Sequence, residues 1–266
     1  MLSGCEWIID LIQKLSNLQR DHILITLMKI KLNDSHKRLV QQFGLSISQI
    51  SKIFRKSVPI IAHFIKTLIL VPSKKEVKNN LPIPFRAFYS DIYGIVDAFE
   101  IEIQKSADSQ SQSATWSEYK HGNTLKYIVV CPPDGLIVFV SKGYEGRVSD
   151  VALFEDSKVM DILPKNIKMM TDRGFKNIDS FLHAKGAELV RPPSVFENEQ
   201  PTKEEVIETK RIASLRIHVE RVIRRIREYS ILKPHASVDL CYMDLMDHIV
   251  TIACGLINLQ SEIIKM

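Results

Sequence analysis

The fold is decided by the stretch Gly94-Ile-Val-Asp97-Ala-Phe-Glu-Ile-Glu-Ile103, an apolar run that carries acidic side chains. Its β-branched and aromatic residues predict a buried β-strand. A second apolar run, residues 167–171, is followed at once by Asp172. In open α/β sheets, ligands bind outside the ends of the strands. Asp97 and Asp172 could therefore share a cation if their strands are neighbours.

Outward from this stretch, strand-like and helix-like segments alternate, and residues 239–264 read as a final apolar helix that closes the core. The turn Pro133-Asp134-Gly135 predicts a hairpin between the second and third strands. The order β-β-β-α-β-α-β-α indicates an α/β fold, a mixed sheet flanked by helices. Residues 106–117, rich in Ser and Gln, read as a surface loop. The further segments are strands at 124–131, 136–141 and 188–191, and helices at 149–161, 178–184 and 202–229.

Residues 1–71 have apolar side chains at helical spacing and predict an all-α region. Within it, a helix, a turn at Gly44 and a second helix capped by Ser46 form a helix-turn-helix pattern, and a plain αα-hairpin is the alternative. The second helix is predicted to bury Ile47, Ile50 and Phe54. Its exposed side chains that could contact DNA in a major groove are Gln49, Lys52 and Arg55.

Charge is unevenly distributed along the 266 residues, whose net charge is +5. Residues 1–80 have 13 basic and 5 acidic side chains, whereas the rest have 23 and 26, so the basic excess is N-terminal, where DNA contact is expected. The four scattered cysteines signal neither a disulfide framework nor a zinc site. No apolar run reaches about 20 residues, so we expect an intracellular protein with no membrane partner.

The composition divides the chain into three parts. Residues 72–88 are polar, charged and Pro-rich, as a linker would be. We therefore predict a helical DNA-binding region at 1–71, a linker at 72–88 and a catalytic α/β domain at 89–266.

The chemistry that these acids favour is two-metal phosphoryl transfer, in which carboxylates converge on two divalent cations. Oxygen ligands select Mg²⁺, with Mn²⁺ as a substitute. Glu220 would join Asp97 and Asp172 from the last long helix, which packs on the sheet through an apolar stripe. That stripe consists of Ile212, Leu215, Val219, Val222 and Ile226. A neighbouring face of the helix carries Arg216, Arg224 and Arg227, which could hold DNA phosphates.

Each candidate residue has a simpler interpretation. Asp172 could be a turn or cap residue, and Asp150 could cap the helix that begins beside it. Glu220 could form a solvated salt bridge with an arginine one turn away. His218 could contact a phosphate or pack beside the apolar stripe. A basic patch comprises Lys120, His121 and Lys126. It could hold a DNA strand, or it could simply be the solvent-exposed edge of a β-strand.

Four ordered motifs together resemble the DDE superfamily endonuclease domain of Harbinger-type transposases. They are Trp116-Ser-Glu-Tyr-Lys-His-Gly-Asn-Thr-Leu-Lys126, Phe139-Val-Ser-Lys-Gly-Tyr-Glu-Gly-Arg-Val-Ser-Asp150, Thr171-Asp-Arg-Gly-Phe175 and Arg216-Ile-His-Val-Glu-Arg221. The resemblance spans roughly residues 90–260, and residues 20–70 resemble the helix-turn-helix that precedes this domain. It implies an RNase H-like fold, metal-dependent DNA cleavage and a nuclear location. It also implies that Asp97, Asp172 and Glu220 are catalytic metal ligands and that Asp150 is a further ligand.

The sequence departs from the family pattern at Ala98-Phe99, where a small residue and Thr are usual, and at Ser106, where Pro is frequent. Related proteins often have an additional N-terminal zinc-binding domain, so a shortened copy is one expectation. These departures motivate the alternative of a domesticated, catalytically inactive protein that binds DNA or a partner. An RNase H-like RNA nuclease is a third hypothesis. A homo-oligomer and a separate DNA-binding partner protein are both left open.

Overall fold

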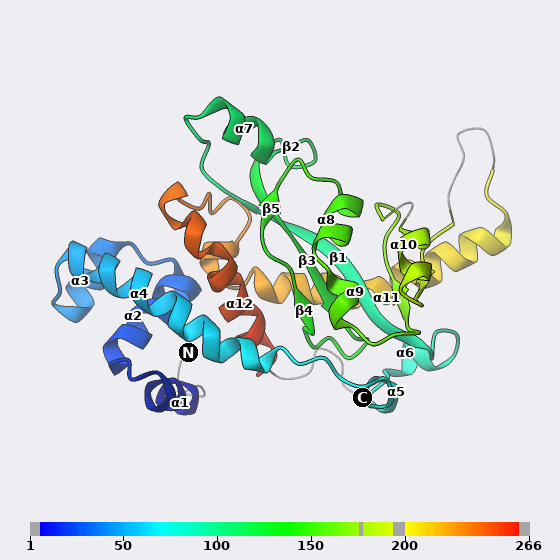
Figure 1. The fold of residues 1–266 in the computed structure, drawn as a ribbon, viewed down its shortest axis with the longest axis horizontal. Coiled ribbons are helices and arrows are strands. Elements are labelled where there is room, and N and C mark those ends of the chain that lie inside the picture. Colours follow the sequence, from blue (N-terminus) through cyan, green and yellow to red (C-terminus); the bar gives the residue numbers. More distant parts are fainter. Residues whose placement is uncertain (1–5, 176–177, 194–199, 261–266) are drawn as a thin grey trace. The chain divides into compact units, whose positions relative to one another are not determined.

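The computed structural model describes residues 6–175, 178–193 and 200–260 (Figure 1). The chain divides into two compact units. The helical unit comprises Met1–Ile69, Ile101–Ala107 and Arg225–Leu259, and the sheet unit comprises Leu70–Glu100, Asp108–Arg224 and Gln260–Met266. This division differs from the predicted one, because residues 225–259 belong with the N-terminal helices and not with the α/β domain.

The helical unit consists of α-helices joined by short turns of 3₁₀ helix. They are α1 (Glu6–Ser16), α2 (Arg20–Leu32), α3 (His36–Phe43), α4 (Ile47–Ile65), η1 (Lys66–Leu68), η2 (Ser230–Leu232), η3 (Leu240–Leu245) and α12 (Met246–Ile257). A small core of Ile25, Leu39 and Ile50 joins α2, α3 and α4. The predicted all-helical N-terminal region is therefore confirmed.

Helices α3 and α4 form the predicted helix, turn and helix. Gly44 ends α3 with a φ of 66°, a left-handed conformation that glycine adopts without strain. Ser46 caps α4 by accepting a hydrogen bond from the Gln49 backbone N–H, while the Gln49 side chain accepts one from the Ser46 N–H. The prediction for Ile47 is wrong: its side chain is 51% exposed, because it lies in the first turn of α4, ahead of the buried Ile50.

Helix α12 packs closely on α4. A Cβ atom at Gly255 would lie 2.7 Å from the backbone oxygen of Ile65, so a glycine is needed where the two helices touch. By length and composition alone, the segment Leu240–Ile257 could cross a membrane, but 56% of it is buried inside the protein. The core helix of a soluble protein passes the same test, so this is weak evidence for a membrane span.

Within the described residues, the sheet unit is built on a seven-stranded mixed sheet in the order β2-β3-β1-β6-β7, with β4 and β5 paired to β3. Strands β6 and β7 run parallel to their neighbours, whereas β2, β4 and β5 are antiparallel to β3. The strands are β1 (Ile92–Glu102), β2 (Trp116–Ser117), β3 (Gly122–Cys131), β4 (Phe139–Val140), β5 (Tyr144–Glu145), β6 (Lys168–Met170) and β7 (Glu188–Val190). The predicted mixed α/β architecture is confirmed.

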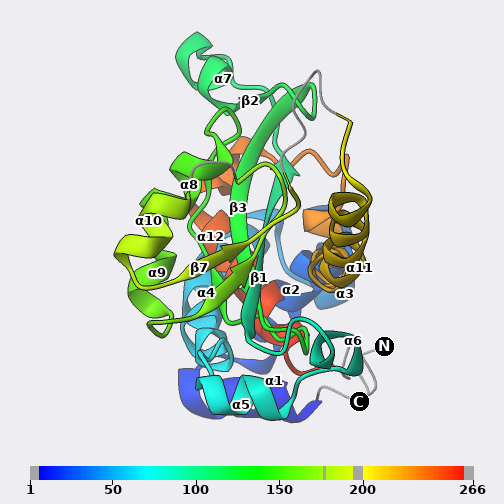
Figure 2. The ribbon, with the colours of Figure 1, turned by 90° about the vertical axis from the view of Figure 1, so that its right-hand side faces the viewer.

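Helices cover both faces of this sheet: α11 lies on one face, and α8, α9 and α10 lie on the other (Figure 2). The five residues of the predicted stripe on α11 are all buried, none more than 4% exposed. The helices of this unit are α5 (Lys74–Asn79), α6 (Ile83–Arg86), α7 (Ser109–Thr115), α8 (Asp150–Asp156), α9 (Val159–Ile162), α10 (Asp179–Ala184) and α11 (Lys203–Ile226).

Three segments of the sheet unit differ from the predictions. The expected loop at 106–117 contains α7, whose N-terminus is capped by Asp108. The single helix expected at 149–161 is divided into α8 and α9, because Lys158 between them has a left-handed backbone. The stretch predicted to be a linker, 72–88, contains α5 and α6, and buries Val77 and Phe85.

Candidate metal centre

The register of two neighbouring strands brings Asp97 and Asp172 together. Strands β1 and β6 are parallel, and Ile95 is paired with Met170. Asp97 lies within β1 and Asp172 two residues past the end of β6, each two residues beyond this pair, so the parallel register brings them close to one another. The neighbour relation that a shared cation requires is therefore present in the structure.

Arg216 of α11 bridges these two acids. Its Nη2 atom lies 3.3 Å from Oδ2 of Asp97 and 3.9 Å from Oδ2 of Asp172. The side chains of Arg216 and Asp97 are only 15% and 16% exposed, and that of Asp172 is 35% exposed. A residue that we predicted to hold DNA phosphates is thus directed at the carboxylates.

Burial makes Asp97 an unusual carboxyl group. Loss of hydration raises its pKa to about 6, against the opposing effect of the Arg216 guanidinium. The neighbouring carboxylates of Asp172 and Glu220 add to the rise in pKa. The charged form of Asp97 is therefore destabilised in the absence of a further cation, as expected of a metal ligand.

Asp172 also lies near a second acid, Asp150, and Gly174 lies next to both. The Gly174 backbone N–H donates a 2.8 Å hydrogen bond to Oδ1 of Asp172. A Cβ atom at Gly174 would lie 3.1 Å from this oxygen and 2.9 Å from Oδ2 of Asp150. The two carboxylates thus approach each other where the missing side chain of Gly174 leaves room.

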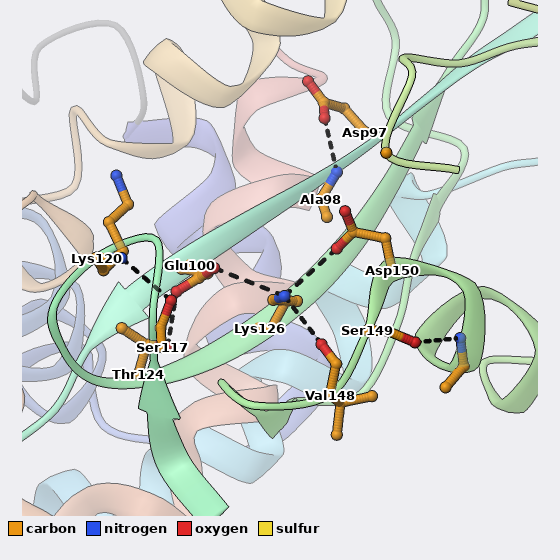
Figure 3. Close-up of polar contacts among 12 residues, drawn as sticks. Asp97, Ala98, Glu100, Ser117, Lys120, Thr124, Lys126, Val148, Ser149 and Asp150 are labelled. Carbon is orange, nitrogen blue, oxygen red and sulfur yellow. Dashed lines mark hydrogen bonds and ion pairs between the residues drawn. The ribbon is translucent and has the colours of Figure 1, made fainter. Parts of the chain in front are cut away.

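Asp150 is held from the opposite direction by Lys126, whose Nζ atom lies 3.4 Å from Oδ1 of Asp150 (Figure 3). The same Nζ donates to the backbone oxygen of Val148 at 2.9 Å and lies 3.7 Å from Oε1 of Glu100. Ser149, and not Asp150, caps α8 by accepting a hydrogen bond from the Ala152 N–H. The capping alternative for Asp150 is therefore wrong.

Glu220 lies on α11 one turn beyond Arg216, with an exposed side chain. Its effect on the pKa of Asp97 shows that it lies within electrostatic range of the first acid. His218 is buried against Phe85, with ring centroids 5.4 Å apart, and its pKa falls to about 4 through burial and the nearby charge of Arg221. His218 is thus a neutral residue of the core, which was the second of its two interpretations.

The residues predicted to bind DNA from the helical unit have varied surroundings. The Gln49 side chain is part of the α4 capping box, and Arg55 pairs with Asp244 and donates to the backbone oxygen of Cys241. Lys52 is exposed on α4. Their contacts with DNA stay predictions.

The remaining predicted DNA-binding residues lie on the surface. His121 has a left-handed backbone in the β2–β3 turn, and Lys120 places its Nζ 4.9 Å from the centre of the Tyr119 ring. Arg224 is exposed and Arg227 is half-buried. Their roles also stay predictions.

Among the residues that the structure describes, no group of three His, Cys, Asp or Glu side chains is close enough to hold a metal ion. Asp97 and Glu100, three residues apart on β1, point to opposite faces of the sheet, so Glu100 does not join Asp97. The donor chemistry nevertheless fits a hard divalent cation, since the side chains around Asp172 offer carboxylate oxygens. Asp97, Asp150, Asp172 and Glu220 are the residues that could supply these oxygens.

Sequence reasoning missed two contributors to this region. Glu100 and Thr124 form a 2.8 Å hydrogen bond next to Lys126, and Glu100 is only 9% exposed at its side chain. Polar residues in the middle of apolar strands were the available signal, because a buried polar side chain needs a partner across the sheet.

The arrangement defines a class: an α/β domain in which an acid of β1 lies near an acid just past the end of β6, preceded by a helix-turn-helix. The family model for the DDE superfamily endonuclease matches residues 96–258, and the model for the helix-turn-helix of DDE superfamily endonuclease matches residues 13–66. The chain belongs to the DDE superfamily endonucleases, since the first match covers more than half of it. Enzymes of this superfamily use divalent metals. A search of curated proteins gave no match.

Proposed function

We propose that this protein is a Harbinger-type, transposase-derived DNA endonuclease that hydrolyses phosphodiester bonds with two divalent metal ions. The observation that carries the proposal is the pairing of β1 with β6, which sets Asp97 beside Asp172. The raised pKa of Asp97 supports it, because a buried carboxylate of this kind is stabilised by a bound cation. The helix-turn-helix supports DNA as the substrate.

In this proposal, Asp97, Asp172 and Glu220 hold the metals, and Asp150 assists. Divalent metal, Mg²⁺ or Mn²⁺ in its place, supplies Lewis-acid stabilisation and an activated water when bound. Arg216 balances the charge of Asp97 and Asp172 in the metal-free protein.

The proposal extends to the cellular setting. DNA is the partner, the helix-turn-helix and the exposed arginines of α11 hold its phosphates, and the protein acts in the nucleus. A homo-oligomer and a separate DNA-binding partner protein are both compatible with this function.

The test measures Mn²⁺ binding to the full-length protein by electron paramagnetic resonance, with generic duplex DNA present. The wild type is compared with a variant that carries Asp97→Asn and Asp172→Asn. Asp21→Asn is the matched control, because it removes an exposed carboxylate of the helical unit. We expect saturable binding by the wild type and the control, and loss of binding in the double variant.

Equal, weak Mn²⁺ binding by all three proteins would reject the nuclease function. It would favour a domesticated protein that binds DNA or a partner through a retired catalytic fold. Binding that is lost only in the double variant would justify a search for the cleaved DNA sequence.

A further inference from the structure

Lys126 holds an ammonium group among oxygen atoms, with a side chain that is only 13% exposed. Three oxygens surround its Nζ atom: the backbone oxygen of Val148 at 2.9 Å, Oδ1 of Asp150 at 3.4 Å and Oε1 of Glu100 at 3.7 Å. A lysine so placed faces the interior of the site and not a DNA surface. Its role must lie in what it does to these oxygens.

We propose that Lys126 is a positioning residue, which fixes the carboxylate of Asp150 so that its second oxygen faces Asp172 and is available to metal. The inference rests on the proposed function and deepens it. The division of the Asp150 carboxylate is its basis: Oδ1 is engaged by Lys126, whereas Oδ2 lies on the Gly174 side, where Oδ1 of Asp172 also lies.

Lys126 can orient Asp150 because its own ammonium group is held in a fixed position. The Val148 carbonyl precedes α8 by two residues, so one ammonium ties both the approach to the helix and its first residue to β3. Glu100 also contacts this ammonium group, and the Thr124 hydroxyl donates a 2.8 Å hydrogen bond to the Glu100 carboxylate (Figure 3). The anchor thus lies on two strands of the sheet, and strands hold a site more precisely than loops do.

Arg216 is a useful contrast. Its contacts with the acids, 3.3 and 3.9 Å, are long, and its buried Nε atom has no hydrogen-bond partner among the described residues. The contact from Lys126 to Oδ1 of Asp150, at 3.4 Å, is no shorter, so the difference lies in the second anchor: Lys126 also donates to the Val148 backbone oxygen at 2.9 Å. Lys126 is thus fixed by a group that does not move with the carboxylate.

Positioning and simple charge balance predict opposite signs. A fixed positive charge beside a metal site weakens cation binding by repulsion, so its removal would tighten the binding of Mn²⁺ if charge were all that mattered. If Lys126 positions Asp150, its removal weakens binding even though a repelling charge is lost, because loss of a residue that orients a ligand costs about 10–100-fold in metal affinity.

The experiment measures the Mn²⁺ dissociation constant of the full-length protein by electron paramagnetic resonance. The variants are Lys126→Met, which removes the ammonium at similar length, and Lys126→Arg, which keeps a charged donor. Lys142→Met is the control, because it removes one charge from an exposed residue that follows β4. We expect a rise of about tenfold or more for Lys126→Met, partial recovery for Lys126→Arg and a change below about twofold for the control.

Loss of Lys126 also leaves Glu100 buried without its cation, which could prevent folding. The double variant Lys126→Met with Glu100→Gln removes that charge while it keeps an acceptor for Thr124. The double variant is therefore expected to fold and still to bind Mn²⁺ weakly. Cleavage kinetics add a second readout, in which kcat falls and the KM for DNA stays unchanged.

Tighter or unchanged Mn²⁺ binding in Lys126→Met and in the double variant would overturn the inference and leave the nuclease function intact. A raised KM for DNA with normal metal affinity would also overturn it, and would assign Lys126 to DNA binding. Absence of Mn²⁺ binding in the wild type would instead reject the proposed function, and the inference with it.

Discussion

The helical unit and the sheet unit each bury a lysine, but they give it different partners. Lys29, 8% exposed, donates to the Asn33 side-chain oxygen at 3.1 Å and to the Asp34 backbone oxygen at 3.0 Å. Lys126 instead approaches two carboxylates as well as a backbone oxygen. The first lysine closes the end of a helix, and the second contacts Glu100 and also Asp150, which lies beside Asp172.

The difference extends to how each unit bears buried charge. Burial lowers the pKa of Lys29, and its hydrogen-bond acceptors satisfy it within one turn of chain after α2. In the sheet unit, burial raises the pKa of Asp97 to about 6, so that its charge weakens the fold. Burial thus disfavours the charged form of both side chains, but Lys29 donates to two oxygens at its own helix end, whereas Asp97 lies beside further carboxylates.

The largest expected effect is a gain of stability in Asp97→Asn. The folded pKa of Asp97 is raised above the ordinary 3.8, so the folded state binds the proton more tightly than the unfolded chain. The wild type, with a metal chelator present, therefore loses stability as pH rises from about 4 through about 6. Asn is neutral at every pH, so the variant should be more stable at pH 8, by up to about 3 kcal/mol, and equally stable near pH 4.

Urea denaturation at pH 4, 6 and 8 checks this. His218, which titrates at low pH, is present in both proteins, so its contribution cancels in the difference. Loss of the Arg216 contact is already included in this gain, because the contact acts on the ionised form of Asp97 and therefore through its pKa. A variant that is less stable at pH 8, or a difference that does not change with pH, would show that the sheet unit does not hold Asp97 at a cost.

The second effect has the opposite sign and belongs to the helical unit. Lys29→Met should lower the free energy of unfolding by about 1–3 kcal/mol, because it leaves the buried Asp34 carbonyl without a donor. Lys37→Met, an exposed substitution on α3, is the control and should change it by less than about 0.5 kcal/mol. Thermal and urea unfolding measure both.

The affinity for Mn²⁺ distinguishes the two lysines. Lys29→Met should leave this affinity unchanged, whereas Lys126→Met should weaken it. If Lys29→Met were neutral in stability, the distinction between a lysine that serves folding and one that serves a site would fail.

The sequence allowed the architecture to be predicted because it depends on local patterns. Alternating apolar runs marked β1 and β6, and the 3-4 spacing of the α11 stripe marked the face that is buried on the sheet. Whether these two strands are neighbours was left as a condition. Their parallel pairing, with Ile95 opposite Met170, came from the structure.

What could not be predicted depends on contacts between distant segments. Lys126 looked like one of three basic residues on a strand edge, and its approach to Asp150 exists only once β3 lies beside α8. The 225–259 segment read as part of the α/β domain because apolar periodicity does not say which core a helix joins. Ile47 shows the same limit within a helix, since its place in the first turn left it exposed.

The smallest effect concerns Gln49, which we predicted to read DNA but which the structure uses to close the N-terminus of α4. Its side-chain oxygen accepts a 2.8 Å hydrogen bond from the Ser46 N–H, so Gln49→Ala should cost about 0.5–1 kcal/mol of stability. Gln42→Ala, on the exposed surface of α3, is the matched control. The affinity for duplex DNA, measured on the same samples, separates the two roles. A loss of affinity without a loss of stability would assign the Gln49 side chain to DNA binding. A loss of stability without a loss of affinity would show that Gln49 serves the fold of the helical unit.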